Sequence, residues 1–295
     1  MQRDYLVKAI SRDGTVRLML ARTTELVEEA RRLHHTSPTA TAALGRALTA
    51  AAMMATDLKS DEFLTIRIAG GGPLGAILVA ARSDGTVRGY VHEPCVDLPE
   101  QEPGKLDVGA AVGRDGFLEV VRDMGLRTPF SGSVPLVSGE IAEDFAYYFT
   151  VSEQIPSLVS LGVRVERDHR VSIAGGLIIQ ALPGAQDEAL SGLEGRVLAL
   201  GPITTWLGGR EALEDLLPEV FGPIEFTVID RRPLAFRCQC SREKVESILA
   251  ALSDEDVQQA LQQQGHLEVV CHFCNTVYRF TAEEVAGIRR PQPSH

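Results

Sequence analysis

Four of the five cysteines in this sequence lie in two short motifs near its C-terminus. The motifs are Cys238-Gln-Cys240 and Cys271-His-Phe-Cys274, with residues 241–270 between them. Each motif can bring two sulfur atoms to one small ion, and zinc prefers four thiolates in a tetrahedron at ~2.3 Å. The spacing therefore predicts one Zn²⁺ per chain, bound by these four cysteines. We expect an apolar shell around the ion from Phe236, Val269, Val270 and Phe273.

Cysteines that bind zinc can also sense oxidants. Zinc keeps its cysteine ligands as thiolates, which oxidants attack, and each oxidised sulfur is lost as a ligand. Adjacent thiols released from zinc can close local disulfides, and loss of the metal removes folding free energy. The alternative is a static zinc ribbon with a purely structural role, which is the commonest role of two cysteine pairs. The C-x-C spacing is less usual in ribbons than C-x-x-C and favours the sensor.

The glycine-rich run Gly70-Gly71-Gly72-Pro73 is a weaker signal. It lacks the Gly-Lys-Ser/Thr ending of a P-loop and the spacing of a dinucleotide fingerprint. We interpret it as a tight turn, and we expect no nucleotide site.

Other reactive residue types are interpreted as structural. His92-Glu93 has no second histidine four residues on, and His34-His35 falls at a predicted helix end, where cations are favourable. His272 lies between two predicted ligands, but four sulfurs already complete a zinc shell. A lone cysteine such as Cys95 usually behaves as a small apolar residue, and we do not include it in the predicted oxidant sensor. Three carboxylates, Glu140, Glu143 and Asp144, are predicted to form a solvated helix face rather than an acid–base pair. With no catalytic group in view, we do not expect an enzyme.

The elements that position these residues are predicted to form two domains and a linker. A chain of 295 residues is long for a single core. Residues 1–183 alternate strand and helix signals and form the large body, whereas residues 184–230 hold short helices separated by Gly and Pro and form a helical linker. Residues 231–295 form a small domain around the four cysteines. The predicted fold class is α+β, with a mixed β-sheet and packed helices in the large N-terminal domain and a zinc-binding α+β module at the C-terminus.

Periodicity and turn residues locate the individual elements. Strands are predicted at 4–11, 15–22, 63–69, 74–81, 86–92, 116–123, 163–169 and 171–182. Helices are predicted at 24–33, 36–57, 140–152, 187–200 and 210–217, with further helix starts at Ser241 and Ser253. The Ala-rich helix 36–57 is expected to pack closely. The C-terminal module has too thin a core to fold well without metal.

Composition excludes several classes of partner. A net charge of -11 and a pI near 5.2 would repel a phosphate backbone, so nucleic acid is not expected. The N-terminal sequence MQRDYLVKAISRDG carries charges where a signal peptide needs an apolar run, and no apolar stretch reaches the ~20 residues of a membrane span. Cysteines crowded into the last part of the chain do not form a spread disulfide framework. We therefore expect a location in a reducing cytoplasm.

The sequence resembles the heat shock protein 33 family of redox-regulated holdase chaperones, also called 33 kDa chaperonins. The resemblance rests on the motifs CQC and CHFC with their spacing, on SGEIAEDFAYYFTVSEQIPS at 138–157, and on AGGLIIQALPGA at 174–185. Chain length and domain order also fit this family from end to end, and all four ligand positions match.

The resemblance implies an ATP-independent chaperone that is inactive while reduced and zinc-bound. In this family pattern, oxidation pairs Cys238 with Cys240 and Cys271 with Cys274, releases zinc and loosens the linker. The exposed apolar surface then binds unfolded or misfolded client proteins during oxidative and heat stress. The resemblance also implies a homodimer in the active state and a cytoplasmic location.

Two other functional classes are possible from the residues alone. A zinc enzyme would need an open coordination position and usually three protein ligands, which four cysteines argue against. A zinc-ribbon adaptor could bind nucleic acid or a partner protein, and an adaptor for nucleic acid would need a basic face near the site. The stretch 253–270 instead carries acidic residues, namely Asp254, Glu255, Asp256 and Glu268.

Overall fold

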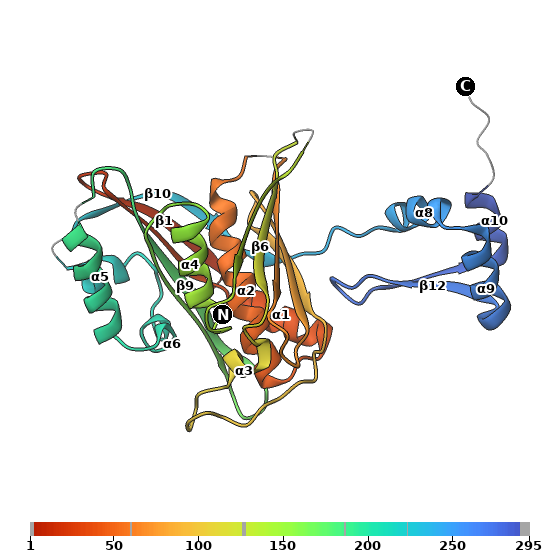
Figure 1. Cartoon of the computed structure of the whole chain (residues 1–295), viewed down its shortest axis with the longest axis horizontal. Helices are drawn as coiled ribbons and strands as arrows, with labels where there is room; N and C mark the ends of the chain where they lie inside the picture. The colour runs from red at the N-terminus through yellow and green to blue at the C-terminus, as the bar shows by residue number, and fades with distance from the viewer. Residues whose placement is uncertain (1–2, 60, 126–127, 186, 223, 290–295) are drawn as a thin grey trace. The chain divides into compact units, whose positions relative to one another are not determined.

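Figure 1 shows the computed structural model of the chain, which describes residues 3–59, 61–125, 128–185, 187–222 and 224–289. The chain divides into two compact units, Met1–Arg237 and Cys238–His295. Both units contain helices and strands, so the predicted α+β class is confirmed. Among the described residues, no helix combines the length and the apolar character that crossing a membrane requires.

The first sheet of the N-terminal unit has five antiparallel strands in the order β10-β1-β2-β9-β8. Its strands are β1 (Tyr5–Ser11), β2 (Val16–Arg22), β8 (Ser157–Val165), β9 (Val171–Ala181) and β10 (Phe226–Pro233). The predicted Asp13-Gly14 turn joins β1 to β2. Asp13 accepts a hydrogen bond from the Thr15 amide, and Gly14 has a φ of 75°, which glycine adopts without strain.

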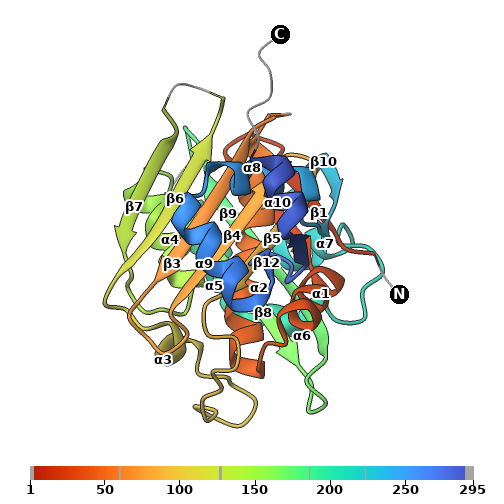
Figure 2. The same cartoon turned by 90° about the vertical axis from the view of Figure 1, so that its right-hand side faces the viewer.

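The second sheet has six strands in the order β11-β5-β4-β3-β6-β7. Figure 2 shows β7, β6, β3 and β4 side by side. The bounds are β3 (Phe63–Ala69), β4 (Ala76–Arg82), β5 (Thr86–Val91), β6 (Phe117–Asp123), β7 (Phe130–Pro135) and β11 (Ala235–Phe236). Strand β11 runs parallel to β5, whereas the other neighbours are antiparallel. The chain segment just before Cys238 thus belongs to this sheet.

Helix α2 (Pro38–Met54) packs against strands of both sheets and forms the centre of the main core. Ser37 caps its first turn by accepting a hydrogen bond from the Ala40 amide, and Pro38 fits the first helical position. The small residues allow close approach, because a Cβ on Gly45 would lie 2.7 Å from a Val27 methyl. The predicted close packing is confirmed. The other helices here are α1 (Thr24–His34), α3 (Val108–Val112), α4 (Ala142–Val151) and the 3-10 turn Ala55–Asp57.

Three short helices cover the opposite face of the five-stranded sheet: α5 (Asp187–Ala199), α6 (Ile203–Leu207) and α7 (Leu216–Phe221). Figure 1 shows α5 and α6 on the far side of this sheet from α2. Along β2, Met19 points into the core around α2, while Leu18 and Leu20 pack against the short helices. The sheet is therefore apolar on both faces. Helices α5, α6 and α7, which lie in the predicted linker region 184–230, cover one of these faces.

Two predicted elements are shifted in the structure. The expected strand at 163–169 is part of β8, which ends at Val165, because the chain turns where the His169 amide donates to the Glu166 carbonyl. The expected helix at 210–217 forms only from Leu216 onward. The carbonyls of Arg210 and Glu211 accept hydrogen bonds from the Arg22 guanidinium and not from amides of a helix.

The C-terminal unit is a small α+β module with a core of its own. Helices α8 (Arg242–Ala251) and α9 (Asp254–Gln264) follow the first cysteine motif, and both predicted helix starts are confirmed. The hairpin of β12 (His266–Val270) and β13 (Val277–Thr281) and the helix α10 (Ala282–Ile288) complete the unit. Among its described residues, the buried hydrophobic side chains are Val245, Leu249, Val257, Leu267, Phe280 and Val285.

Candidate metal centre

The structure brings the four predicted cysteines together. The ligand atoms of Cys238, Cys240, Cys271 and Cys274 all lie within 4.8 Å of one another, and all four residues are half-buried. The Sγ atoms of Cys238 and Cys271 are 3.6 Å apart, and those of Cys240 and Cys274 are 3.4 Å apart. A tetrahedron of sulfurs at ~2.3 Å from zinc has edges of about 3.8 Å. The donor set and its spacing fit a zinc ion.

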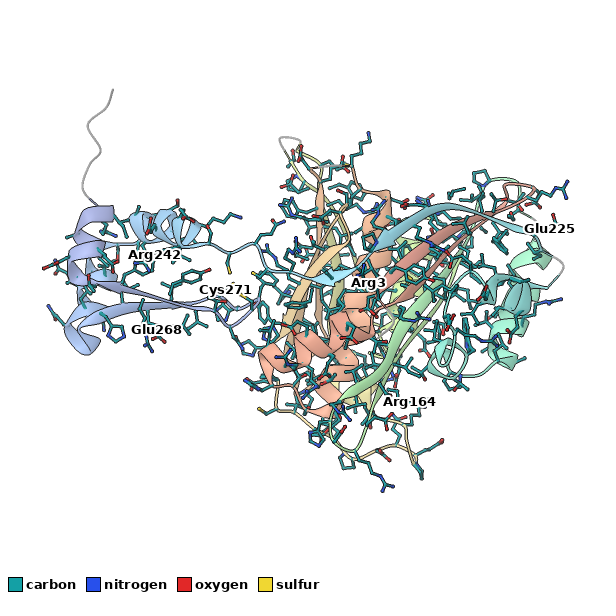
Figure 3. All side chains as sticks on the ribbon, turned by 180° about the vertical axis from the view of Figure 1, so that it is seen from behind. Arg3, Arg164, Glu225, Arg242, Glu268 and Cys271 are labelled. Atoms are coloured by element: carbon teal, nitrogen blue, oxygen red, sulfur yellow. The ribbon has the colours of Figure 1, made fainter. Side chains whose placement is uncertain are left out.

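The second motif lies in the turn between β12 and β13, where Figure 3 labels Cys271. The Cys271 amide donates to the Thr276 carbonyl at 3.0 Å, which closes the turn at its base. The amides of Cys274 and Asn275 both donate to the Cys271 carbonyl. Asn275 has a φ of 55°, a left-handed conformation that asparagine tolerates better than most residues. This compact turn aims Cys271 and Cys274 at the same point.

The first motif is held by the start of α8. Ser241 caps the helix by accepting a hydrogen bond from the Lys244 amide at 3.3 Å. The Lys244 ammonium group reaches back to the Gln239 carbonyl at 2.7 Å. The cap and this contact fix the backbone between Cys238 and Cys240, so both sulfurs face the turn of the hairpin.

Two hydroxyl groups contact the sulfurs. The Tyr278 hydroxyl donates to Cys240 Sγ at 3.1 Å, and the Thr276 hydroxyl lies 3.2 Å from Cys274 Sγ. Neither residue was recognised from the sequence. The available signal was their position, two and four residues after the last cysteine of the motif.

The pKa values of the thiols reflect their crowding. Burial raises the pKa of Cys271 to about 12, and that of Cys240 is also raised, chiefly by burial. Burial acts in the same direction at Cys274, but hydrogen bonds with Thr276, Cys240 and Cys238 together lower its pKa to about 7. A bound dication would favour the charged form of every sulfur. The cluster is thus suited to hold a soft divalent metal as a set of thiolates.

Of the four residues predicted to form an apolar shell around the ion, Phe236 belongs to the N-terminal unit, Val270 is exposed, and Val269 and Phe273 are half-buried. Val269 packs on the core of the C-terminal unit, whereas Val270 is 40% exposed. Phe236 packs instead on the core of the N-terminal unit, where its ring contacts His34 at 6.4 Å between centroids. Phe236 does so because β11 extends the six-stranded sheet.

The residues interpreted as structural lie outside this cluster. Among the described residues, the four cysteines form the one group of this kind that can hold a metal ion, and the exposed His272 is not part of it. Cys95 is exposed and does not pack as a small apolar residue. His34 is buried in the N-terminal unit, and His92 is exposed beside Glu93.

The glycine run forms the tight turn predicted for it. The Gly72 amide donates to the Val112 carbonyl at 2.9 Å, and the Leu74 amide to the Ala111 carbonyl at 3.0 Å. A Cβ on Gly70 would lie 2.2 Å from the Gly113 carbonyl oxygen. These amides bind backbone rather than a phosphate group.

The prediction of a solvated carboxylate face is wrong for Asp144. This residue is fully buried and accepts hydrogen bonds from the amides of Val137, Ser138, Gly139 and Ile141. Asp144 therefore caps α4 and the loop before it, and these amides satisfy its buried carboxyl oxygens. Glu140 is also partly buried and pairs with Arg46 at 2.7 Å.

Comparisons with known proteins cover both units of the chain. The sequence model of the family described as Hsp33 protein matches residues 4–281. A 33 kDa chaperonin of Desulforamulus reducens is 50% identical over 285 residues, covering 97% of each chain. A 33 kDa chaperonin of Geobacillus kaustophilus is 47% identical over 287 residues, covering 97% of this chain and 98% of its own. The crystal structure of the 33 kDa chaperonin from Thermotoga maritima matches with a TM-score of 0.90 at 42% identity, covering 98% of each chain.

Proposed function

The chain belongs to the Hsp33 protein family, and from this premise we propose that it is a redox-regulated chaperone that holds unfolding proteins without ATP. Its relatives are named chaperonins rather than enzymes. The observation that carries the redox control is the cluster of four cysteine sulfurs within 4.8 Å of one another.

In the reduced state, Cys238, Cys240, Cys271 and Cys274 would hold one Zn²⁺. When bound, the ion keeps the four sulfurs as thiolates and contributes ~10 kcal/mol or more to the stability of a small module. The C-terminal unit needs such a contribution, because only six of its described residues form a buried hydrophobic core. Its fold is therefore proposed to depend on the state of the cysteines.

Each disulfide forms by a two-electron oxidation, and we take hydrogen peroxide as the class of oxidant. One thiolate of a pair attacks a peroxide oxygen, which gives a sulfenic acid and releases hydroxide. The second thiolate attacks that sulfur, the S–O bond breaks, and another hydroxide leaves as the S–S bond forms. The family pattern pairs Cys238 with Cys240 and Cys271 with Cys274, so two peroxides take four electrons and remove all four ligands.

The client-binding surface is proposed to be the apolar face of the five-stranded sheet under α5, α6 and α7. The sheet residues on this face are Val7, Ala9, Val16, Leu18, Leu20, Leu177 and Ile179. Helices as short as α6 and α7 are marginal without packing, so they are suited to a cover that can open. Strands β10 and β11 connect this cover to Cys238 along the chain.

The proposed partners are unfolded or misfolded proteins, bound through this apolar surface. The active form is proposed to be a homodimer in the bacterial cytoplasm, following the family pattern. The net charge of -11 supports a protein that does not bind nucleic acid. No nucleotide or further cofactor is proposed.

The proposal is tested by following zinc and holding activity together. Purified reduced protein is treated with peroxide at raised temperature, zinc is measured with a chromogenic chelator, and light scattering reports aggregation of a heat-denatured client. We expect about one zinc released per chain, together with a gain in suppression of aggregation. Cys95→Ser is the matched control, because this exposed cysteine lies outside the cluster and its loss should change neither signal. Zinc that leaves without any gain in holding would contradict the switch and favour a structural zinc module.

A further inference from the structure

We propose that Tyr278 and Thr276 are positioning residues of the cysteine cluster, which set its affinity for metal and slow its oxidation. The inference rests on the proposed function, because it concerns the sulfurs that would bind zinc. Their hydroxyl groups lie 3.1 and 3.2 Å from the sulfurs of Cys240 and Cys274.

Tyr278 links the two motifs. It lies in β13 opposite Val269, and its ring packs on the core of the C-terminal unit. From this anchored position its hydroxyl reaches Cys240, which belongs to the other motif and lies 38 positions earlier in the chain. A phenol has one O–H to donate, and here Cys240 Sγ receives it. The tyrosine therefore links the hairpin to a sulfur that the segment before α8 supplies.

Thr276 acts on the sulfur of Cys274 within the turn. A thiolate carries no proton, so a deprotonated Cys274 can only accept, and the threonine hydroxyl must be the donor. The Thr276 carbonyl is itself fixed by the Cys271 amide at 3.0 Å. The hydroxyl is thus presented by a backbone that the turn already holds in place.

The two hydroxyls act on neighbouring sulfurs from different motifs. The Sγ atoms of Cys240 and Cys274 lie 3.4 Å apart, and each cysteine belongs to a different proposed disulfide. Hydrogen bonds to a charged acceptor are stronger than neutral ones and orient it. They also withdraw charge from the sulfur, and where the metal already keeps the sulfur as a thiolate, a less basic thiolate is a poorer nucleophile toward an oxidant. Both proposed disulfides would therefore form faster without these donors.

The test uses the full-length protein with Tyr278→Phe and Thr276→Val, each of which removes a hydroxyl and keeps the size of the side chain. Groups that orient metal ligands typically contribute ~10- to 100-fold to metal affinity, so we expect zinc affinity at least ~10-fold below wild type. Affinity is measured by competition with a chromogenic chelator. Peroxide should release zinc faster from both variants than from the wild type.

A second readout separates positioning from simple structural support. In cobalt(II)-loaded protein, loss of a donor makes the thiolate more electron-rich, so the sulfur-to-metal charge-transfer band should move to longer wavelength. Matched controls are Tyr147→Phe, an exposed tyrosine on α4, and Ser247→Ala, an exposed hydroxyl on α8. Both controls should leave the zinc affinity and the cobalt band unchanged.

The outcomes distinguish this inference from the proposed function. Wild-type affinity and an unshifted band in both variants would overturn the positioning role and leave the redox switch standing. Weaker zinc binding with an unshifted band and an equal loss of thermal stability would assign these residues to the fold alone, which also overturns it. Wild-type protein that binds no zinc would instead remove the proposed function, and the inference with it.

Discussion

At the scale of single residues, Asp4 shows how burial turns an ordinary carboxylate into a pH-sensitive group. It is 6% exposed, and its Oδ2 accepts a hydrogen bond from the Leu26 amide in the first turn of α1 at 2.7 Å. Its backbone carbonyl accepts from the Leu234 amide, just before β11. Burial raises the pKa of Asp4 from 3.8 to about 6, although its hydrogen bonds to amides act in the opposite direction. The group therefore joins β1, α1 and the end of β10 while favouring its neutral form.

This shift predicts a pH dependence of stability. Because the pKa of Asp4 is higher in the folded state, its contribution to the free energy of unfolding is fully present below pH 3.8. This contribution is lost as pH rises through about 6. A shift of this size corresponds to roughly 3 kcal/mol at most. Asp4→Asn keeps an oxygen for the Leu26 amide and cannot ionise. The stability of this variant relative to wild type should therefore rise as the pH is raised from 3.8 to about 6. Urea unfolding at several pH values measures this difference, and a constant difference would contradict the shifted pKa.

At the scale of elements, polar contacts attach the covering helices to the five-stranded sheet. The Tyr5 hydroxyl donates to Glu214 at 3.0 Å and accepts from the Leu213 amide at 2.6 Å. Arg231 of β10 pairs with the same glutamate, and Arg22 of β2 donates to the carbonyls of Arg210 and Glu211. These contacts lie between α6 and α7, where residues 210–215 belong to neither helix.

We expect Tyr5→Phe to loosen this cover in the reduced protein. The change removes two hydrogen bonds of about 1 kcal/mol each, which together correspond to about a 30-fold larger open population. Hydrogen exchange of the amides in residues 203–221 should become faster, and holding of a client should increase without oxidant. Tyr147→Phe is the control, since this tyrosine lies on α4 and not under the cover. Unchanged exchange would show that apolar packing alone holds the cover closed.

At the scale of the whole molecule, the two units differ in what stabilises them. The N-terminal unit buries a continuous core between two sheets, centred on α2. The C-terminal unit has a small core beside a cluster of half-buried cysteines. A change in the state of the sulfurs should therefore unfold one unit and leave the sheets of the other intact.

Removal of metal from the reduced protein tests this difference directly. We expect a strong chelator to raise amide exchange throughout 238–289 to the level of an unfolded chain, because ~10 kcal/mol or more of stabilisation is lost. Strands β2, β3, β4 and β9 should keep their protection. Mass spectrometry of peptides after exchange resolves the two units, and a C-terminal unit that stays protected without metal would contradict this expectation.

The sequence by itself determined the features that depend on residues close together in the chain. The α+β class, the central helix α2 and most of the sheet strands follow from local periodicity, caps and turns. Cys238 with Cys240 and Cys271 with Cys274 were recognised from spacing, because such short motifs can place two sulfurs together whatever surrounds them. The sequence did not identify β7, β10, β12 or β13, whose neighbours and turns give weak local patterns.

Only the tertiary structure decided features that depend on segments distant in the chain. Asp144 resembles a surface carboxylate in sequence, but the loop from Val137 to Ile141 folds over it and supplies four amides. Tyr278 reaches Cys240 only because the β12–β13 hairpin returns the chain beside the first motif. Residues 210–215 fail to form a helix because Arg22 and Tyr5 take their backbone groups. In each case a polar group is satisfied by a partner whose position is set by packing and sheet order, which local sequence does not encode.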